Sequence, residues 1–230
     1  MLNPPVRILL VDDHAVVRAG YRRFLEQEPG YEVVAESSSG EEAYALLQSR
    51  AQLPDVVVLD LSMPGGGGLS TLRRMKIRWP LLPVLVCSMH DNLAFAIQAL
   101  RAGANGYMTK SSDPAFMVIA VRRVLTGTVA LSPDIEAKLE RNAGNDADTP
   151  TLGLSVREFE IFRLIAAGKS HEEIAALLNL SAKTVANNHS LIKQKLAIST
   201  DIELFQLAVG CGAVESASAT QSAGYTIEGP

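Results

Sequence analysis

The chain lacks the features that mark a secreted, disulfide-bonded or membrane-spanning protein. It has only two cysteines in 230 residues, Cys87 and Cys211, too few for a disulfide framework. No apolar run reaches the roughly 18 residues of a membrane span, and the N-terminus has no signal-peptide pattern. A net charge of -4 gives no overall sign of nucleic-acid binding. We therefore expect a cytoplasmic protein with no membrane partner, whose binding surfaces are formed locally.

Short apolar runs alternate with helical patterns through the first half of the chain. The runs lie at 6–11, 31–36, 55–61, 82–88 and 104–109, and the helical patterns at about 14–27, 40–50, 69–78, 91–102 and 114–126. Runs that are apolar on both faces are typical of a parallel sheet covered by helices on both sides. Five such units predict a doubly wound α/β domain with a five-stranded parallel sheet over residues 5–127.

Polar residues follow the predicted strands where they end. They are Asp12 and Asp13, Asp60, Ser88 and Lys110. Because ligands bind beyond the carboxyl ends of the strands in such sheets, we expect these side chains to converge on one edge. Three carboxylates in one place imply a hard cation, and Mg²⁺ takes oxygen ligands while sharing its shell with phosphate. A carboxylate, a cation, a lysine and a hydroxyl together suit the formation of an acyl phosphate.

Each of these residues also has a structural interpretation when taken alone. Paired aspartates before a helix commonly cap it and interact favourably with its dipole. A single aspartate at a strand end, such as Asp60, is often only part of a loop. His90, two residues after Ser88, could cap a helix, face solvent or affect the lifetime of a phosphoryl group. The joint pattern at the ends of separate strands favours the functional interpretation.

The first half resembles the receiver domain of bacterial two-component response regulators, over essentially all of residues 5–127. The resemblance implies a flavodoxin-like sheet of strand order 2-1-3-4-5, with phosphorylation of Asp60 in the stretch VVLDLSMPG. It also implies a site for the cofactor Mg²⁺. Its ligands would be Asp12, Asp13, Asp60 and the backbone carbonyl of Ser62.

The same resemblance assigns roles to three further residues. Ser88 and Lys110 would contact the phosphoryl group, and Ser88 and Tyr107 would move inward as a switch. Taken alone, Tyr107 could instead be a half-buried core tyrosine. Many receivers have a proline after the lysine, where this chain has Ser111, but related regulators also lack it.

Four consecutive glycines, Gly65–Gly68, follow the predicted phosphorylation site. Such a run carries a large backbone entropy, which could make it a mobile rim of the site. The alternative, which we favour, is that one glycine is structurally required and its neighbours are not.

The second half has regular helix-start signals. Residues 128–152 are interpreted as a linker that includes a short helix at about 131–142. Ser155 with Glu158 and Ser170 with Glu173 predict capping boxes, and Ser181 predicts a third helix start. Together with a fourth helix from about Asp201, they predict a helix-turn-helix domain over 153–213. Residues 214–230 are typical of a disordered tail.

Residues 152–210 resemble the LuxR-type helix-turn-helix of the NarL/FixJ class of response regulators. The resemblance places the third helix, about 182–196, in the major groove of double-stranded DNA. The expected DNA-contacting residues are Lys183, Thr184, Ala186, Asn187, Ser190, Lys193 and Lys195. Residues 180–200 contain three lysines and no acid, which predicts a thin local basic face.

We therefore expect a DNA-binding transcription regulator that is controlled by phosphorylation by a sensor histidine kinase and is not an enzyme. Two alternatives remain, a receiver joined to a helical protein-interaction module and an aspartyl-phosphate phosphohydrolase. The phosphohydrolase class needs a second acid two residues after its nucleophile, where this chain has Ser62. We also expect a homodimer. The apolar helix at 91–102 is the first candidate interface, and the last helix, through Leu204, Leu207 and Ala208, is the second.

Overall fold

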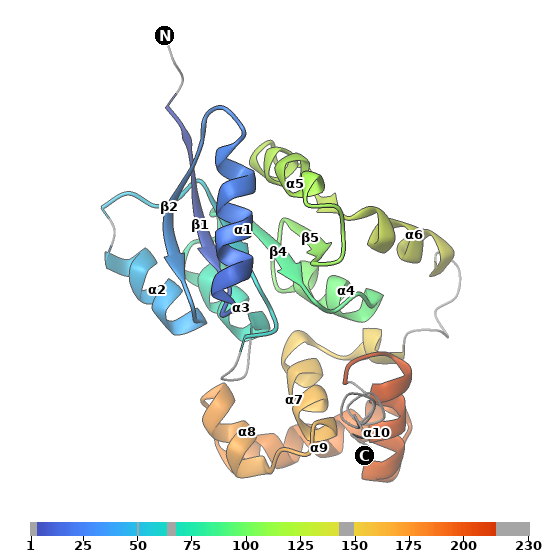
Figure 1. Ribbon diagram of the computed structural model, residues 1–230. Coiled ribbons are helices and arrows are strands. Elements are labelled where there is room, and N and C mark those ends of the chain that lie inside the picture. Colours follow the sequence, from blue (N-terminus) through green and yellow to red (C-terminus); the bar gives the residue numbers. More distant parts are fainter. Residues whose placement is uncertain (1–3, 50, 64–67, 143–149, 215–230) are drawn as a thin grey trace, which may run out of the picture.

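The structure is a computed structural model that describes residues 4–49, 51–63, 68–142 and 150–214. An α/β unit at the N-terminal side is followed by a smaller helical unit (Figure 1). Within the described ranges, no helix combines the length and apolar character needed to cross a bilayer.

The α/β unit contains a six-stranded parallel sheet of order β2-β1-β3-β4-β5-β6. The strands are β1 Val6–Val11, β2 Tyr31–Ser37, β3 Val56–Leu59, β4 Val84–Ser88, β5 Gly106–Thr109 and β6 Ala130–Leu131. The helices are α1 Ala15–Glu26, α2 Gly40–Ser49, α3 Gly68–Arg78, α4 Leu93–Arg101, α5 Ala115–Leu125 and α6 Pro133–Asn142. The strand order confirms the predicted arrangement of the first five strands.

The sheet is buried on both faces, as the continuous apolar runs predict. Alternate side chains of β1 point to opposite sides, since successive residues of a strand face opposite ways. Ile8 and Leu10 pack with α5 residues on one face, while Leu9 and Val11 pack with α2 and α3 residues on the other. This double burial holds the carboxyl ends of the strands in one rigid row.

The segment interpreted as a linker is partly folded onto the α/β unit. Residues 130–131 form β6, a strand that the sequence analysis did not predict, and α6 confirms the expected short helix. The remainder of the linker at 143–149 lies outside the described residues, and residues 150–153 form a 3₁₀ helix, η2. The predicted tail lies outside the described residues apart from Val214.

The helical unit contains α7 Val156–Ala166, α8 His171–Leu178, α9 Ala182–Leu196 and α10 Asp201–Gly210. The capping boxes of Ser155 and Ser170 are present, and the Ser181 side chain caps α9. Thr200 and Glu203 form a further capping box that the sequence analysis missed. Between α8 and α9, Asn179 adopts the left-handed conformation that makes the tight turn. The helix-turn-helix is thus defined by local sequence signals.

The apolar face of α4 is covered by the helical unit of the same chain. Phe95 of α4 meets Phe159 of α7 edge to face, with ring centroids 5.2 Å apart. Gln98 and Arg101 donate hydrogen bonds to the backbone of Leu154 and Leu152. The interpretation of this face as a dimer surface is therefore wrong for this arrangement of the domains, because its surplus apolar area is already used.

The second candidate dimer surface is also corrected. Leu204 and Ala208 of α10 are fully buried inside the helical unit, and Leu207 is partly buried against the same core. The exposed apolar side chains of α10 are instead Ile202 and Phe205.

Gly68 supports the interpretation that one glycine of the run is required. A Cβ atom at this position would lie 2.2 Å from the Cα of Leu61, which is too close for any side chain. Residues 64–67, including the other three glycines, lie outside the described residues.

Gly106 generates a test of the packing between β5 and its neighbours. A Cβ atom there would lie 2.8 Å from the Ala130 carbonyl oxygen and 2.9 Å from Leu85 Cδ1. We predict that Gly106→Ala lowers the free energy of unfolding by about 1–3 kcal/mol in a urea titration. Gly20→Ala is the control, because a Cβ meets nothing within 4 Å on exposed α1, and it should stabilise by about 0.5–1 kcal/mol. Equal stabilities for the two variants would contradict the described sheet packing.

Candidate functional site

Two buried aspartates and a lysine meet where β1, β3 and β5 end. Lys110 Nζ lies 2.6 Å from an Asp12 carboxylate oxygen and 2.8 Å from Asp60 Oδ2. Asp60 is only 1% exposed and Asp12 4%. The expected convergence of these three side chains is therefore present, with the lysine bridging both acids.

The electrostatics of this group depend on the balance between burial and Lys110. Burial raises the pKa of Asp60, while Lys110 and the backbone N–H of Ser62, which donates to Asp60 Oδ1 at 2.9 Å, act in the opposite direction. Burial alone would lower the pKa of Lys110, but its hydrogen bonds to Asp12 and Asp60 outweigh that effect and raise it. The lysine therefore keeps its charge at neutral pH.

The oxygen atoms of this site suit a hard divalent cation. Ligand atoms of Asp12, Asp13, His14 and Asp60 all lie within 4.8 Å of one another. Asp13 Oδ1 is buried and accepts no hydrogen bond, while His14 Nδ1 lies 2.9 Å from it. A buried carboxylate oxygen that lacks a hydrogen bond from the described residues and lies beside two further acids fits the chemistry of Mg²⁺, which receiver domains generally bind at an acidic pocket. His14 was not identified from the sequence as part of this group.

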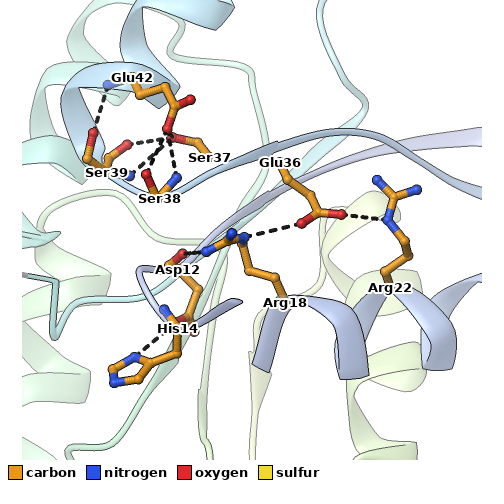
Figure 2. A network of polar contacts seen from close by, with 9 residues as sticks. All are labelled: Asp12, His14, Arg18, Arg22, Glu36, Ser37, Ser38, Ser39 and Glu42. Carbon is orange, nitrogen blue, oxygen red and sulfur yellow. Dashed lines mark hydrogen bonds and ion pairs between the residues drawn. The ribbon is translucent and has the colours of Figure 1, made fainter. Parts of the chain in front are cut away.

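A polar network on α1 and β2 holds the backbone of Asp12. Figure 2 shows Arg18 and Arg22 of α1 on either side of Glu36. Arg18 Nη1 also donates to the Asp12 carbonyl oxygen at 2.6 Å. The hydrogen bond from Arg22 is the largest cause of the lowered pKa of Glu36, so the Glu36 carboxylate between the two arginines stays ionised. Sequence reasoning missed these residues because their contacts join separate elements.

Ser88 and Tyr107 lie beside the acidic group and are both fully buried. The Ser88 hydroxyl accepts a hydrogen bond from the backbone N–H of His90 at 3.2 Å. The Tyr107 hydroxyl donates to the His90 carbonyl oxygen at 2.6 Å. The ring of Tyr107 is thus already in the inward position expected of the switched state, so no inward rotation of this ring is needed.

The imidazole of His90 packs against α4. It stacks on Phe95 with ring centroids 3.8 Å apart, and burial lowers the pKa of His90 to about 4. Among the options left open by the sequence, neither a helix cap nor a solvent-facing ring matches this position. His90 connects the strand ends to the α4 surface on which α7 packs.

The α9 helix lies on the side of the helical unit away from the α/β unit (Figure 1). Of the residues expected to read bases, Asn187 is exposed and Ala186 partly exposed. Ser190 donates its hydroxyl to the Ala186 carbonyl, and Thr184 hydrogen-bonds with the capping Ser181. Asn187 therefore has the freest polar side chain on this face, with no hydrogen bond in the described part of the chain.

The basic face of α9 is weaker than its sequence indicates. Lys193 Nζ pairs with Asp201 at 2.7 Å and Lys195 Nζ with Glu158 at 2.7 Å. Both acids come from other helices, outside the residues that the local charge count covered. Among the three lysines, Lys183 is exposed and makes no ion pair with any described residue. The expectation of an acid-free basic face is corrected accordingly.

A histidine pair that the sequence analysis missed fixes α9 to its neighbours. His189 Nδ1 of α9 lies 3.1 Å from His171 Nε2 of α8. His189 Nε2 lies 2.8 Å from Asp201 Oδ1 of α10. Nothing in the local sequence indicates that these residues meet.

Two family models match consecutive parts of the chain. The response regulator receiver domain matches residues 8–122, and the luxR family of bacterial regulatory proteins matches residues 152–208. The combination corresponds to the two units of the fold.

Curated relatives extend this likeness over nearly the whole chain. The transcriptional activator protein ExaE of Pseudomonas putida is 41% identical, over 92% of this chain and 99% of ExaE. The response regulator GacA of Pseudomonas aeruginosa is 38% identical, over 93% of this chain and all of GacA.

A solved structure agrees with both units. RcsB of Salmonella enterica serovar Typhimurium, bound to a promoter in the presence of a phosphomimetic, has a TM-score of 0.71 and 29% identity. The likeness covers 88% of this chain and 97% of RcsB. The chain therefore belongs to the NarL/FixJ class of response regulators, DNA-binding transcription regulators that join a receiver domain to a LuxR-type domain.

Proposed function

We propose that phosphorylation of Asp60 controls how the helix-turn-helix domain engages DNA. The domains are the receiver at 5–127 and the DNA-binding domain at 153–213. The observation that carries the proposal is the Asp60 carboxylate itself. It is buried at the sheet edge and held by Lys110 Nζ at 2.8 Å in an acidic group.

The chemistry assigns one task to each contacting group. An Asp60 carboxylate oxygen forms the new bond to phosphorus, while the bond between phosphorus and the donor breaks. The donor is a phosphohistidine of a sensor kinase or a small acyl phosphate. Lys110 would supply positive charge to the transferred oxygens, and the Ser88 hydroxyl, which here accepts from the His90 N–H, would donate to one of them. The Ser62 N–H keeps Asp60 oriented.

The residues that would hold Mg²⁺ are Asp12, Asp13 and Asp60, with the carbonyl of Ser62. When bound, the ion would neutralise charge on the phosphoryl oxygens. We propose that His14 contributes only outside this set, because an imidazole is a poor ligand for Mg²⁺.

A continuous set of contacts connects this site to the DNA-binding domain. Ser88 and Tyr107 both hydrogen-bond to the backbone of His90, whose ring stacks on Phe95. Phe95 then packs on Phe159 of α7. A phosphoryl group that draws Ser88 toward Asp60 must therefore disturb the surface on which α7 rests.

The DNA-reading helix faces outward even in this arrangement, so the receiver does not act by covering it. We propose instead that docking fixes the direction of α9 and that loosening allows two copies to reach adjacent half-sites. One domain offers few free cations, and a homodimer would supply the affinity that one copy lacks. We propose no enzymatic turnover on other substrates, since Ser62 stands where a phosphohydrolase needs its second acid.

Asp60→Asn tests the phosphorylation site. Acetyl phosphate with Mg²⁺ should add one acid-labile phosphoryl group to the wild type and none to the variant, because an amide is not a nucleophile for this transfer. Intact-protein mass spectrometry gives the readout, with Asp55→Asn at the opposite end of β3 as the control that keeps labelling. Equal labelling of Asp60→Asn would exclude Asp60 as the acceptor.

Asp13→Asn tests the cation site. Its buried carboxylate oxygen lies 2.9 Å from His14 Nδ1 but has no hydrogen bond with any described residue, so the fold should be kept while a charged ligand disappears. We expect the Mg²⁺ concentration for half-maximal phosphorylation to rise at least about tenfold, since coordination prefers charged oxygens. Glu41→Gln, on the exposed start of α2, should leave it unchanged. An unaltered Mg²⁺ requirement in Asp13→Asn would remove Asp13 from the set.

Two substitutions on α9 separate charge from base reading. Lys183→Ala should weaken binding to all DNA sequences alike and lower the salt slope by about one. Asn187→Ala should reduce preference at one base pair, by about 1–3 kcal/mol, and leave the slope nearly unchanged. Lys193→Ala should affect the slope less than Lys183→Ala, because Asp201 already pairs with it. Fluorescence anisotropy over a salt series measures all three, and uniform weakening by Asn187→Ala would argue against this placement of α9.

A further inference from the structure

Glu160 is a carboxylic acid buried at the contact between the two domains. It lies on α7, which packs against α3 and α4 of the receiver, and it is only 1% exposed. Among the described residues, neither carboxylate oxygen has a hydrogen-bond partner of normal geometry. The nearest ion-pair partner is Arg157 Nη1, at 3.8 Å from Oε2. A buried acid in this condition is unusual and needs an explanation.

The charged groups that face Glu160 come from both domains. Arg157 and Arg163 belong to its own helix, Arg73 belongs to α3 of the receiver, and the backbone of Ser70 at the start of α3 also favours the ionised form. Arg163 is itself partly buried with its guanidinium over the Phe95 ring, and its Nε has no hydrogen-bond partner in the part of the chain that the structure describes. On α4 lies the buried and neutral Gln98, whose Oε1 also has no hydrogen-bond partner within the described ranges.

Several polar atoms without partners therefore gather at one interface. Separating the domains would let water reach these atoms, which is favourable, but would also expose the apolar surface around Phe95 and Phe159. For Glu160 a second solution exists, since taking up a proton removes the charge that burial penalises. Burial outweighs the arginines and raises the pKa of Glu160 to about 7.

We propose that docking of the DNA-binding domain on the receiver takes up one proton at Glu160, and that separation of the domains releases it. Acidification then holds the domains together, while a more alkaline medium loosens them. The proton balance does not depend on phosphorylation or on DNA. Only its consequence for regulation rests on the proposed function.

The sign follows from the two states. A separated, hydrated Glu160 returns toward the ordinary carboxyl pKa of 4.5, so only the docked state binds a proton between about pH 4.5 and 7. From pH 8 to pH 6 this favours docking by about tenfold. His90, beside Arg163, acts in the opposite direction, because burial lowers its pKa to about 4 and exposure would let it gain a proton. Its effect over the same range is at most about fourfold.

Glu160→Gln isolates the proposed proton because it keeps the shape and removes the titration. Dyes on cysteines placed at exposed Gln52 and Gln206 would report the domain separation by single-molecule energy transfer, in a Cys211→Ser background with buried Cys87 retained. From pH 8 to pH 6, we expect the docked-to-separated ratio of the parent relative to Glu160→Gln to rise about tenfold. Glu172→Gln, on the exposed side of α8, should behave like the parent.

A direct titration covers the case in which the variant is misfolded or the domains rarely separate. The carboxyl carbon of Glu160 in the unsubstituted protein, followed by ¹³C nuclear magnetic resonance, should titrate with a midpoint near pH 7. A midpoint below pH 5 in the docked protein would overturn the proposal. An identical pH response of the parent and Glu160→Gln would overturn it as well. Either result would leave the Asp60 labelling test untouched, so the two ideas fail separately.

Discussion

The bridge from Lys110 to Asp12 and Asp60 is the interaction on which the receiver depends. Two carboxylates buried a few ångströms apart repel each other and lose hydration, and one lysine offsets both costs. The same bridge makes the site responsive, because an added cation or phosphoryl group must compete for or share that lysine. Lys110 sits in the loop after β5, where Thr109 and Ser112 hydrogen-bond to Asp134 of α6. We propose that these contacts pass a shift of the lysine to α6, the helix that leads to the second domain.

The contact between α4 and α7 is the interface at which we propose that such a shift changes the arrangement of the domains. Its apolar centre is the Phe95–Phe159 pair, and its polar surroundings are poorly satisfied at Gln98, Glu160 and Arg163. An interface with both properties is held by a small net free energy, since the apolar gain is offset by unmet hydrogen bonds. We propose that this weakness is what allows one phosphoryl group, and one proton, to change the arrangement of the domains.

Much of the fold and of the candidate site could be predicted from the sequence, because there a local pattern has one structural outcome. Apolar runs separated by helical patterns predict strands and helices to within two residues of those observed, and parallel strands must bring Asp12, Asp60 and Lys110 to one edge. Ser155 and Ser170 mark helix starts because the capping box is made within four residues. Such features depend on neighbours in the sequence.

The remainder depends on contacts between distant segments. Lys193 and Lys195 look unpaired until α10 and α7 bring Asp201 and Glu158 beside them. The apolar face of α4 indicates a partner correctly, but hydrophobicity cannot distinguish another chain from a later part of the same one. The two-residue strand β6 has too little pattern to detect. Glu160 resembles any acid on a helix, and only the packing of two domains makes it unusual.

We propose that the state of Asp60 alters the contact between α4 and α7. Amide hydrogen exchange of residues 93–101 and 156–166, compared with and without beryllofluoride as a phosphoryl mimic, measures this most directly. We expect faster exchange in both segments when the mimic is bound, and no change in Asp60→Asn. Unchanged exchange in both segments, in a sample where the mimic increases DNA binding, would show that the signal travels by another route.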